Sequence, residues 1–360
     1  MRRVSTDSAQ PGMFLGKTII GGAGQILLKS GVEIKPQYLT YLERLGINYI
    51  YVQDSRMEDV EINDIIREEI RQEARSLVRD VIKKVPSPSN QKKGLNIKDK
   101  KVLKTVSSII EDLLEDDDTI SQLMDIRSLD DYLFSHSVNS CILATLVGKK
   151  LNYNINTLKQ LAMGTLLHDM GMVAVPEKIL KKPGELTEDE YATVKNHPHY
   201  GYEIFKSSKL FSAQAGAVIL RHHERYHGQG YPQGLKSNEN SALAQIAGIA
   251  DVYDALTSER SYRKAFQPYQ AIEMLMAWGE DYFDMEILNH FLSMTAAYPI
   301  GFHVFLSNGE SGLVIANNQG LTLRPVVRVL YTGEDLAPHP SPYDLDLSQV
   351  LDITIVKVLD

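Results

Sequence analysis

The sequence contains a single cysteine, Cys141, and this scarcity excludes two kinds of architecture. One thiol cannot form an intramolecular disulfide, and it cannot supply the several thiolates of a multi-cysteine zinc site. The lack of a disulfide framework fits a reducing compartment. Any metal bound by this chain is therefore expected to have nitrogen and oxygen ligands.

Long apolar runs and excess positive charge are also missing. No stretch of about 20 apolar residues is present to span a bilayer, and the opening MRRVSTDSAQPGMF lacks the apolar core of a signal peptide. We therefore expect a cytoplasmic protein with no membrane segment. The formal net charge of -8 argues against a broad surface for a nucleic-acid polymer or an anionic membrane. A small anionic ligand held by metal and a few arginines stays open.

What the sequence does contain is a cluster of histidines. Seven of the 10 histidines fall within fewer than 100 residues, where an even scatter would be the ordinary expectation. This clustering indicates where the chemistry should be sought. The seven are His136, His168, His197, His199, His222, His223 and His227.

The first quarter of the chain predicts a small module followed by a helix. With 360 residues, 43% hydrophobic and 23% charged, the chain is long enough for two or three globular domains. Residues 12–54 alternate short apolar runs with glycine around a helical segment that begins at Pro36, which indicates an α+β module without catalytic groups. Apolar spacing predicts an amphipathic helix over 62–85, and PSPSNQKKG, residues 86–94, is the best linker candidate.

The remainder changes from a helical to a strand pattern at Pro299. Residues after the linker are almost wholly helical in pattern, whereas two apolar runs around Asn308-Gly309 predict a hairpin. We therefore predict a mainly α protein in four parts: an N-terminal accessory or regulatory module with its connecting helix (1–85), a linker (86–94), a helical domain (95–299) and a small β extension (300–360).

The polar residues of the helical domain gain meaning as a set. Singly, a buried histidine bonded to a carbonyl is commoner than a metal ligand. Together, imidazoles mixed with carboxylates suit iron, manganese, nickel or zinc. The pair His168-Asp169, at a predicted helix end, is hard to bury as ordinary core because helix neighbours point about 100° apart and each needs a partner. An aspartate that bridges two metals solves this, so the pattern suggests a dinuclear site.

Four motifs carry a resemblance to a known family. The ordered set HD, KNHPHYG, HHERYHGQGYP and DVYDALTSERSYRKA resembles the HD-GYP domain, a subclass of the HD phosphohydrolase superfamily, over residues 125 to 300. The tail after Pro299, with GESGLV, is similar to the extension behind such domains. The resemblance implies a helical HD-type metal-dependent phosphohydrolase domain that hydrolyses cyclic di-GMP to pGpG, with further cleavage to GMP left open.

The resemblance also implies a metal centre. Two divalent ions, most favourably iron or manganese with nickel or zinc as alternatives, would hold a hydroxide that attacks the phosphodiester. His168 and Asp169 would be the catalytic pair, with Asp169 bridging the metals. The full implied ligand set is His136, His168, Asp169, His197, His222, His223 and Asp251.

Substrate contacts are implied for a second set of residues. Asp254 lies three residues after Asp251 on the same helix face and would bind a guanine edge or orient water, unless it is an ordinary surface charge. Arg260 and Arg263 match positions that hold phosphate, unless they are ordinary exposed charges. A loop that supplies backbone geometry, and that would line the substrate cleft or face a protein partner, contains Gly228, Gly230, Tyr231 and Pro232.

Two positions depart from the HD-GYP pattern. Met172 stands in place of a lysine thought to contact the scissile phosphate, and the loss of one such contact costs on the order of 10²-fold in rate. Tyr132 replaces the glutamate of three-metal members, so we expect two metals. The alternatives to a phosphodiesterase are a cyclic di-GMP receptor with little or no turnover and a hydrolase for another nucleotide. A protein partner through the loop or the N-terminal module, and a homodimer, also stay open.

Overall fold

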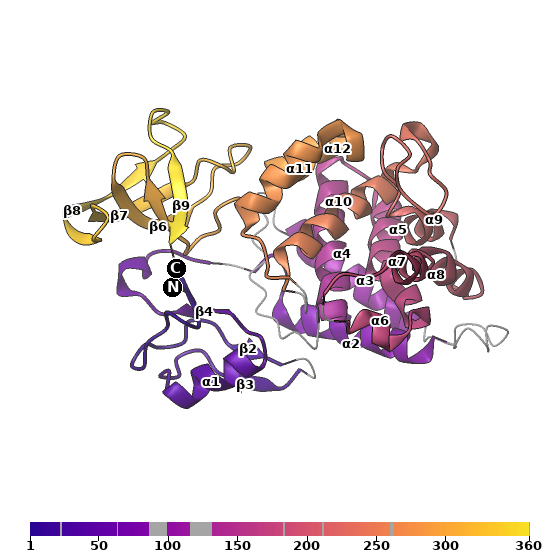
Figure 1. Cartoon of the computed structure of the whole chain (residues 1–360), viewed down its shortest axis with the longest axis horizontal. Helices are drawn as coiled ribbons and strands as arrows, with labels where there is room; N and C mark the ends of the chain where they lie inside the picture. Colours follow the sequence, from indigo (N-terminus) through magenta and orange to yellow (C-terminus); the bar gives the residue numbers. More distant parts are fainter. Residues whose placement is uncertain are drawn as a thin grey trace. The chain divides into compact units, whose positions relative to one another are not determined.

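The computed structural model describes residues 1–21, 24–62, 64–85, 99–115, 132–182, 184–210, 212–259 and 263–359. The chain divides into two compact units (Figure 1). The first, the terminal unit, contains Met1–Asp64 together with Leu292–Asp360, and the second, the helical unit, contains Ile65–Asp117 and Tyr132–Phe291.

The N-terminal part of the terminal unit is the predicted α+β module. Strand β1 (Arg2–Ser5) pairs antiparallel with β4 (Tyr49–Val52), and β2 (Ile19–Ile20) pairs with β3 (Ile26–Leu28). Helix α1 (Pro36–Arg44) begins at the predicted proline, whose fixed φ and missing N–H suit a first helical turn. A short 3-10 turn, η1 (Ser55–Met57), follows.

The C-terminal part of this unit is a five-stranded antiparallel sheet in the order β8-β7-β6-β5-β9. The predicted hairpin joins β5 and β6, and Gly309 in its turn has φ +84°, a conformation that favours glycine. The strands are β5 (His303–Leu306), β6 (Glu310–Ala316), β7 (Val326–Thr332), β8 (Ala337–Asp346) and β9 (Ile355–Leu359).

Contacts between distant sequence segments hold the terminal unit together. The Arg328 guanidinium lies 2.6 Å from Asp59 and 2.8 Å from Asp344. Met57 packs in a buried cluster with Leu313 and Leu330. The module and the β sheet, which the sequence suggested as separate parts, therefore share one core cluster and an ion-pair network.

The helical unit is built around two helices that are buried on nearly every side, α4 (Tyr132–Lys150) and α10 (Ala242–Thr257). A helix whose residues are apolar or small all round belongs in a protein interior. The others are α2 (Glu68–Lys84), α3 (Asp99–Glu115), α5 (Ile155–Leu166), η4 (His168–Ala174), α6 (Glu177–Leu180), α7 (Glu188–Val194), α8 (His197–Lys206), α9 (Ala213–Arg221), η5 (Ser237–Glu239), α11 (Pro268–Tyr282) and α12 (Met285–Ser293), which runs to the unit boundary.

The fold class is the predicted one, a mainly helical protein with an α+β N-terminal module and a β extension. The helix predicted over 62–85 is α2, which belongs to the helical unit. The linker predicted at 86–94 lies outside the described residues, and the four-part division with its boundaries stays a prediction.

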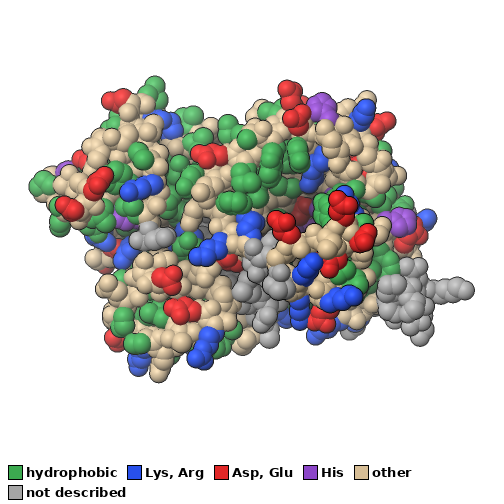
Figure 2. All heavy atoms as spheres, viewed as in Figure 1, with side chains coloured by type: hydrophobic (Ala, Val, Ile, Leu, Met, Phe, Trp, Pro, Cys, Tyr) green, Lys and Arg blue, Asp and Glu red, His purple; other side chains and the backbone are tan. Residues whose placement is uncertain are grey.

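Two observations bear on the nucleic-acid and membrane partners that the sequence argued against. Acidic and basic side chains are interspersed over the face seen in Figure 2, and neither sign gathers into a broad field there. Among the residues that the structure describes, no helix has the length and apolar character needed to cross a membrane.

Candidate metal centre

The histidines and aspartates of the site lie at helix ends or in buried helix interiors. His136 and Asp251 project from the two central helices, α4 and α10. His168 and Asp169 open η4, the 3-10 turn that follows α5. Helix α5 ends at Leu166, two residues before His168, so the pair lies just past the helix end near which the sequence placed it. His197 begins α8, while His222 caps the C-terminal end of α9 and His223 follows it.

Two glycines allow the close backbone approaches that bring these ends together. At Gly171 an added Cβ would lie 2.6 Å from the backbone nitrogen of Gly201 and closer still to the carbonyl oxygen of His197. At Gly248 an added Cβ would lie 2.5 Å from the carbonyl oxygen of His222. Any side chain at these positions would separate η4 from α8, and α10 from α9, because packed backbones leave no room for it.

The seven residues implied as ligands lie together in two groups. In each group, one potential ligand atom from every member lies within 4.8 Å of the others. Six of the seven side chains are buried, and His223 is partly exposed. Group A contains Asp169, His197, His222 and His223, and group B contains His136, His168 and Asp251.

Both aspartates divide their two oxygens between the groups. In Asp169, Oδ1 lies 3.2 Å from Nε2 of His197 in group A, while Oδ2 lies 3.5 Å from Nε2 of His168 in group B. In Asp251, Oδ1 lies 3.0 Å from Nε2 of His136, while Oδ2 lies 3.6 Å from Nδ1 of His223. The two groups are therefore joined by carboxylates, which is the geometry expected of ligands that serve two neighbouring ions.

Hydrogen bonds fix which nitrogen of each imidazole faces the centre. A backbone carbonyl only accepts, so a histidine whose Nδ1 faces one carries a proton on Nδ1 and turns Nε2 the other way. In a neutral ring that Nε2 is the nitrogen that can bind a metal. Nε2 of His168 is buried and has no hydrogen-bond partner among the described residues, as expected of a metal-ligand atom. The Nδ1 contacts are His168 to Thr165 O (2.6 Å), His197 to Val194 O (2.8 Å) and His222 to Ile219 O (2.9 Å).

Burial and hydrogen bonding shift the histidines of the site in opposite directions beside charged carboxylates. Burial and the neighbouring His168 and His197 lower the pKa of His222 to about 3. Burial would raise the pKa of Asp251, but its hydrogen bond to His136 and the nearby histidines outweigh burial and lower it. For His136, hydrogen bonds to Asp251 and Asp254 overcome burial and raise the pKa to about 9. A divalent cation would take the place of that proton, since metal ligation requires the unprotonated nitrogen.

Asp254 does not occupy the position predicted for a substrate contact. Its side chain is completely buried, with Oδ2 2.8 Å from Nδ1 of His136 and accepting from the Ser258 hydroxyl at 3.2 Å. Oδ1 accepts from the Asn139 amide at 3.2 Å. The expected contact with a guanine edge is therefore not supported, because the carboxylate of Asp254 is already engaged with His136 of group B and its buried neighbours.

Arg263 is also engaged elsewhere. Its guanidinium donates to the carbonyl oxygens of Ala255 at 2.7 Å and Leu256 at 3.2 Å, at the C-terminal end of α10, and it lies over the Phe266 ring. In this structure it satisfies helix-end carbonyls and does not present an open phosphate site. Arg260 lies outside the described residues.

The loop with Gly230, Tyr231 and Pro232 packs directly against the histidine pair. The Tyr231 ring stacks on the His223 ring with centroids 4.6 Å apart, and the backbone N–H of Tyr231 donates to the His223 carbonyl. Gly230 has no room for a side chain, since a Cβ would meet the backbone of residues 223–225. Pro232, which follows the stacked tyrosine, is exposed. The loop therefore covers one side of group A, and its expected role in lining a substrate cleft or facing a protein partner stays a prediction.

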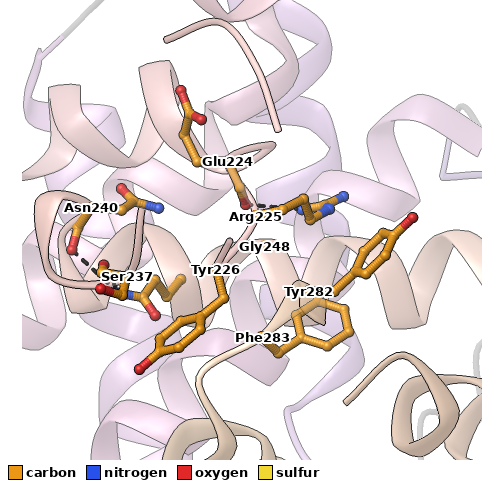
Figure 3. Close-up of a pocket in the computed structure, with 9 residues that line it drawn as sticks. Glu224, Arg225, Tyr226, Ser237, Asn240, Gly248, Tyr282 and Phe283 are labelled. Carbon is orange, nitrogen blue, oxygen red and sulfur yellow. Dashed lines mark hydrogen bonds between the residues drawn. The ribbon is translucent and has the colours of Figure 1, made fainter. Parts of the chain in front are cut away.

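Glu224 holds this loop and was missed from the sequence. Its buried carboxylate accepts from the backbone N–H of Gln233 at 2.7 Å and of Leu235 at 2.9 Å. Figure 3 shows Glu224 at a recess that it lines together with Arg225 and Tyr226. The available signal was its place directly after His222 and His223, because a carboxylate buried beside them needs several hydrogen-bond donors.

The departures from the family pattern have simple surroundings. Met172 lies in η4, three residues after Asp169, and is half-buried. Tyr132 begins α4 and stacks on His136 with ring centroids 5.3 Å apart. An aromatic ring therefore lies against a group B histidine at the position where three-metal members of the family have a glutamate.

The fold and the centre together define a helical protein with a two-group His/Asp site. The sequence model of the HD domain matches residues 108–287, and that of the KOW domain associated with HD domains matches residues 303–360. The chain belongs to the HD domain family. Its recognition as an HD-GYP protein is confirmed by this match and by its curated relatives.

Several named relatives share part of the chain. Cyclic di-GMP phosphodiesterase PA4108 of Pseudomonas aeruginosa is 34% identical over 235 residues, which are 65% of this chain and 56% of the relative. Cyclic di-GMP phosphodiesterase response regulator RpfG of Xanthomonas campestris is 44% identical over 142 residues, 39% of this chain and 38% of the relative. The 3'3'-cGAMP-specific phosphodiesterase 2 of Vibrio cholerae is 37% identical over 141 residues, 37% of this chain and 27% of the relative. The chain thus spans about half or less of these relatives.

Proposed function

We propose that this chain is a metal-dependent phosphodiesterase that hydrolyses cyclic di-GMP to pGpG at the centre formed by groups A and B. The names of the relatives support the substrate class, because they act on cyclic dinucleotides. The donor set supports the cofactor. Neutral imidazoles with carboxylates suit first-row divalent ions, with iron or manganese favoured and nickel or zinc as alternatives.

One observation carries the proposal: Asp169 and Asp251 each turn one oxygen to group A and one to group B. Two buried carboxylates need nearby positive charge or hydrogen-bond donors, which the histidines supply without metal. When bound, two divalent ions supply that charge, offset the charge of a phosphodiester and activate water for in-line attack. We therefore propose the seven residues of the two groups as the metal ligands and Asp169 as a bridge.

The chain's own residues orient and shield this centre. Backbone carbonyls hold the Nδ1 protons of His168, His197 and His222 and aim each Nε2 inward. Asp254 does the same for His136. Tyr231 covers the exposed side of group A. These contacts fix the ligands before metal arrives, so little reorganisation accompanies binding.

The test is an anaerobic assay of the full chain loaded with iron(II) or manganese(II). The proposal expects about two ions per chain and formation of pGpG from cyclic di-GMP, with any GMP appearing later. Parallel assays with 3'3'-cGAMP separate a cyclic di-GMP enzyme from one for another cyclic dinucleotide. Tight nucleotide binding with no cleavage of either substrate would refute the phosphodiesterase. Asp169→Asn is the matched negative control, since it keeps the side-chain shape and loses the negative charge.

A second candidate, a cyclic di-GMP receptor with little turnover, is favoured by Met172. The half-buried methionine brings no positive charge to the place where the family pattern has a lysine. Met172→Lys is expected to raise turnover by up to about 10²-fold if one phosphate contact is all that is missing. Met172→Gln serves as the uncharged control. An unchanged rate in the lysine variant would show that Met172 does not limit turnover. The protein partner and the homodimer stay predictions.

A further inference from the structure

Helix α2 buries two arginines against the rest of the helical unit, which is costly unless the charges serve a purpose. Arg71 is 1% exposed and Arg75 is 5% exposed. A buried guanidinium needs compensation by hydrogen bonds and by opposite charge. Glu68 supplies part of that charge, with its carboxylate 3.5 Å from Nε of Arg71. The remaining contacts of Arg71 lead toward the metal centre.

A chain of hydrogen bonds runs from Arg71 to Asp254. The Arg71 guanidinium donates to the Asn139 Oδ1 at 2.9 Å, and the Asn139 amide donates to the Asp254 Oδ1 at 3.2 Å. The chemistry of the two ends fixes the asparagine orientation, since arginine can only donate and a carboxylate only accepts. All three side chains are buried, so water does not compete for these bonds.

The chain continues from Asp254 into group B. The second oxygen of Asp254 lies 2.8 Å from Nδ1 of His136, and Nε2 of the same ring lies 3.0 Å from Asp251. The Ser258 hydroxyl donates to that second oxygen at 3.2 Å. Helices α2, α4 and α10 each contribute a member, so the orientation of His136 depends on the position of α2 (Figure 1).

Group A lacks a connection of this kind among the described residues. Its histidines His197 and His222 are held by backbone carbonyls of their own or the preceding turn. These contacts form whenever the local helix forms. His136 is different, because its Nδ1 partner is a side chain 118 residues away.

We propose that Arg71 is a positioning residue for group B: through Asn139 and Asp254 it sets the ring orientation of His136 and thereby the affinity of the second metal ion. The inference rests on the proposed dinuclear function. Partners behind a metal ligand typically change metal affinity by about 10- to 100-fold when removed. Loss of Arg71 acts on group B selectively, because group A is held locally.

The experiment compares Arg71→Met with Arg75→Met in the full chain. Both substitutions remove a buried guanidinium from the same helix, so they share the general destabilisation. Each metal-free protein is titrated with manganese(II), and bound ions are counted while the electron paramagnetic resonance spectrum reports coupling between two ions. Arg71→Met is expected to keep one ion at wild-type affinity, to bind the second about 10- to 100-fold more weakly and to lose the coupled signal. Arg75→Met is expected to keep both ions and the signal.

Two further variants separate the inference from general damage. Asn139→Ala interrupts the same chain while leaving Arg71 in place, and it should reproduce the selective loss. Arg71→Lys keeps the positive charge and a donor nitrogen, and it should restore part of the affinity for the second metal ion. Equal binding of two ions by wild type, Arg71→Met and Asn139→Ala would overturn the inference. If the wild type itself binds fewer than two ions, the proposed dinuclear function fails instead.

Discussion

Replacement of Gly171 by alanine is expected to disable group A while the helical unit stays folded. A Cβ there would lie 2.6 Å from the Gly201 nitrogen, whereas ordinary contact begins at 3.4 Å. Turn η4 must therefore move away from α8 by about 0.8 Å at Gly201 and by more at His197. Metal sites tolerate ligand displacements of about 0.2 Å, so Asp169 and His197 can no longer share an ion. Overpacking of this kind costs about 1–3 kcal/mol, less than the typical stability of a domain.

The assay combines metal counting with urea unfolding. The variant and wild type are stripped of metal, titrated with manganese(II) and unfolded while the helical signal is followed. Gly201→Ala is the matched control on the facing helix, where a Cβ would lie 3.2 Å from the Gly171 nitrogen and needs only a small adjustment. We expect the control to bind two ions, and we expect Gly171→Ala to bind the ion of group A more weakly than wild type does. Wild-type binding of both ions by Gly171→Ala would show that η4 and α8 do not need their close approach.

Three other outcomes follow from buried groups. Cys141 is fully buried and burial raises its pKa to about 12, so a thiol reagent should label it only in urea; rapid labelling of the native protein would contradict its burial. Glu224→Ala should lower the free energy of unfolding by about 2–4 kcal/mol, since two bonds to a charged acceptor are lost. Glu224→Gln should fall between, and wild-type stability in both would refute the loop-holding role. Burial, with Arg2 and Arg56 adding to it, lowers the pKa of His303 to about 4 from its usual 6.5. The unfolded state therefore binds this proton more readily, and stability should fall between pH 6.5 and 4 by up to about 1.4 kcal/mol per pH unit; the same slope in His303→Asn would exclude this residue as the cause.

Local signals in the sequence were sufficient for several elements, and the resemblance to HD-GYP domains supplied the seven residues that lie together. Pro36 begins a helix and Asn308-Gly309 makes a hairpin, because each depends on residues only a few positions apart. The seven proposed ligands were nominated by motif order, and the structure brings all of them together. Their role as ligands is still a proposal, since geometry alone shows proximity.

Partners far apart in sequence could not be foreseen. The spacing of Asp251 and Asp254 correctly indicates one helix face, but it does not say that His136, from another helix, occupies the space between them. The family resemblance implied a phosphate contact for Arg263. Nothing local in the sequence shows that its guanidinium turns back to the carbonyls of α10. Glu224 was overlooked because its donors are backbone groups of a loop whose path was unknown.

The terminal unit has a consequence for synthesis of the chain. The Arg3 N–H donates to the Gly301 carbonyl at 2.9 Å, and Met57 is buried against Leu313 and Leu330. A ribosome adds about 5–20 residues per second, so the N-terminal module waits on the order of 10 to 50 s for these partners. The helical unit is complete in sequence by Phe291, before most of the β strands emerge. The middle of this protein is therefore free to fold before the terminal unit is complete.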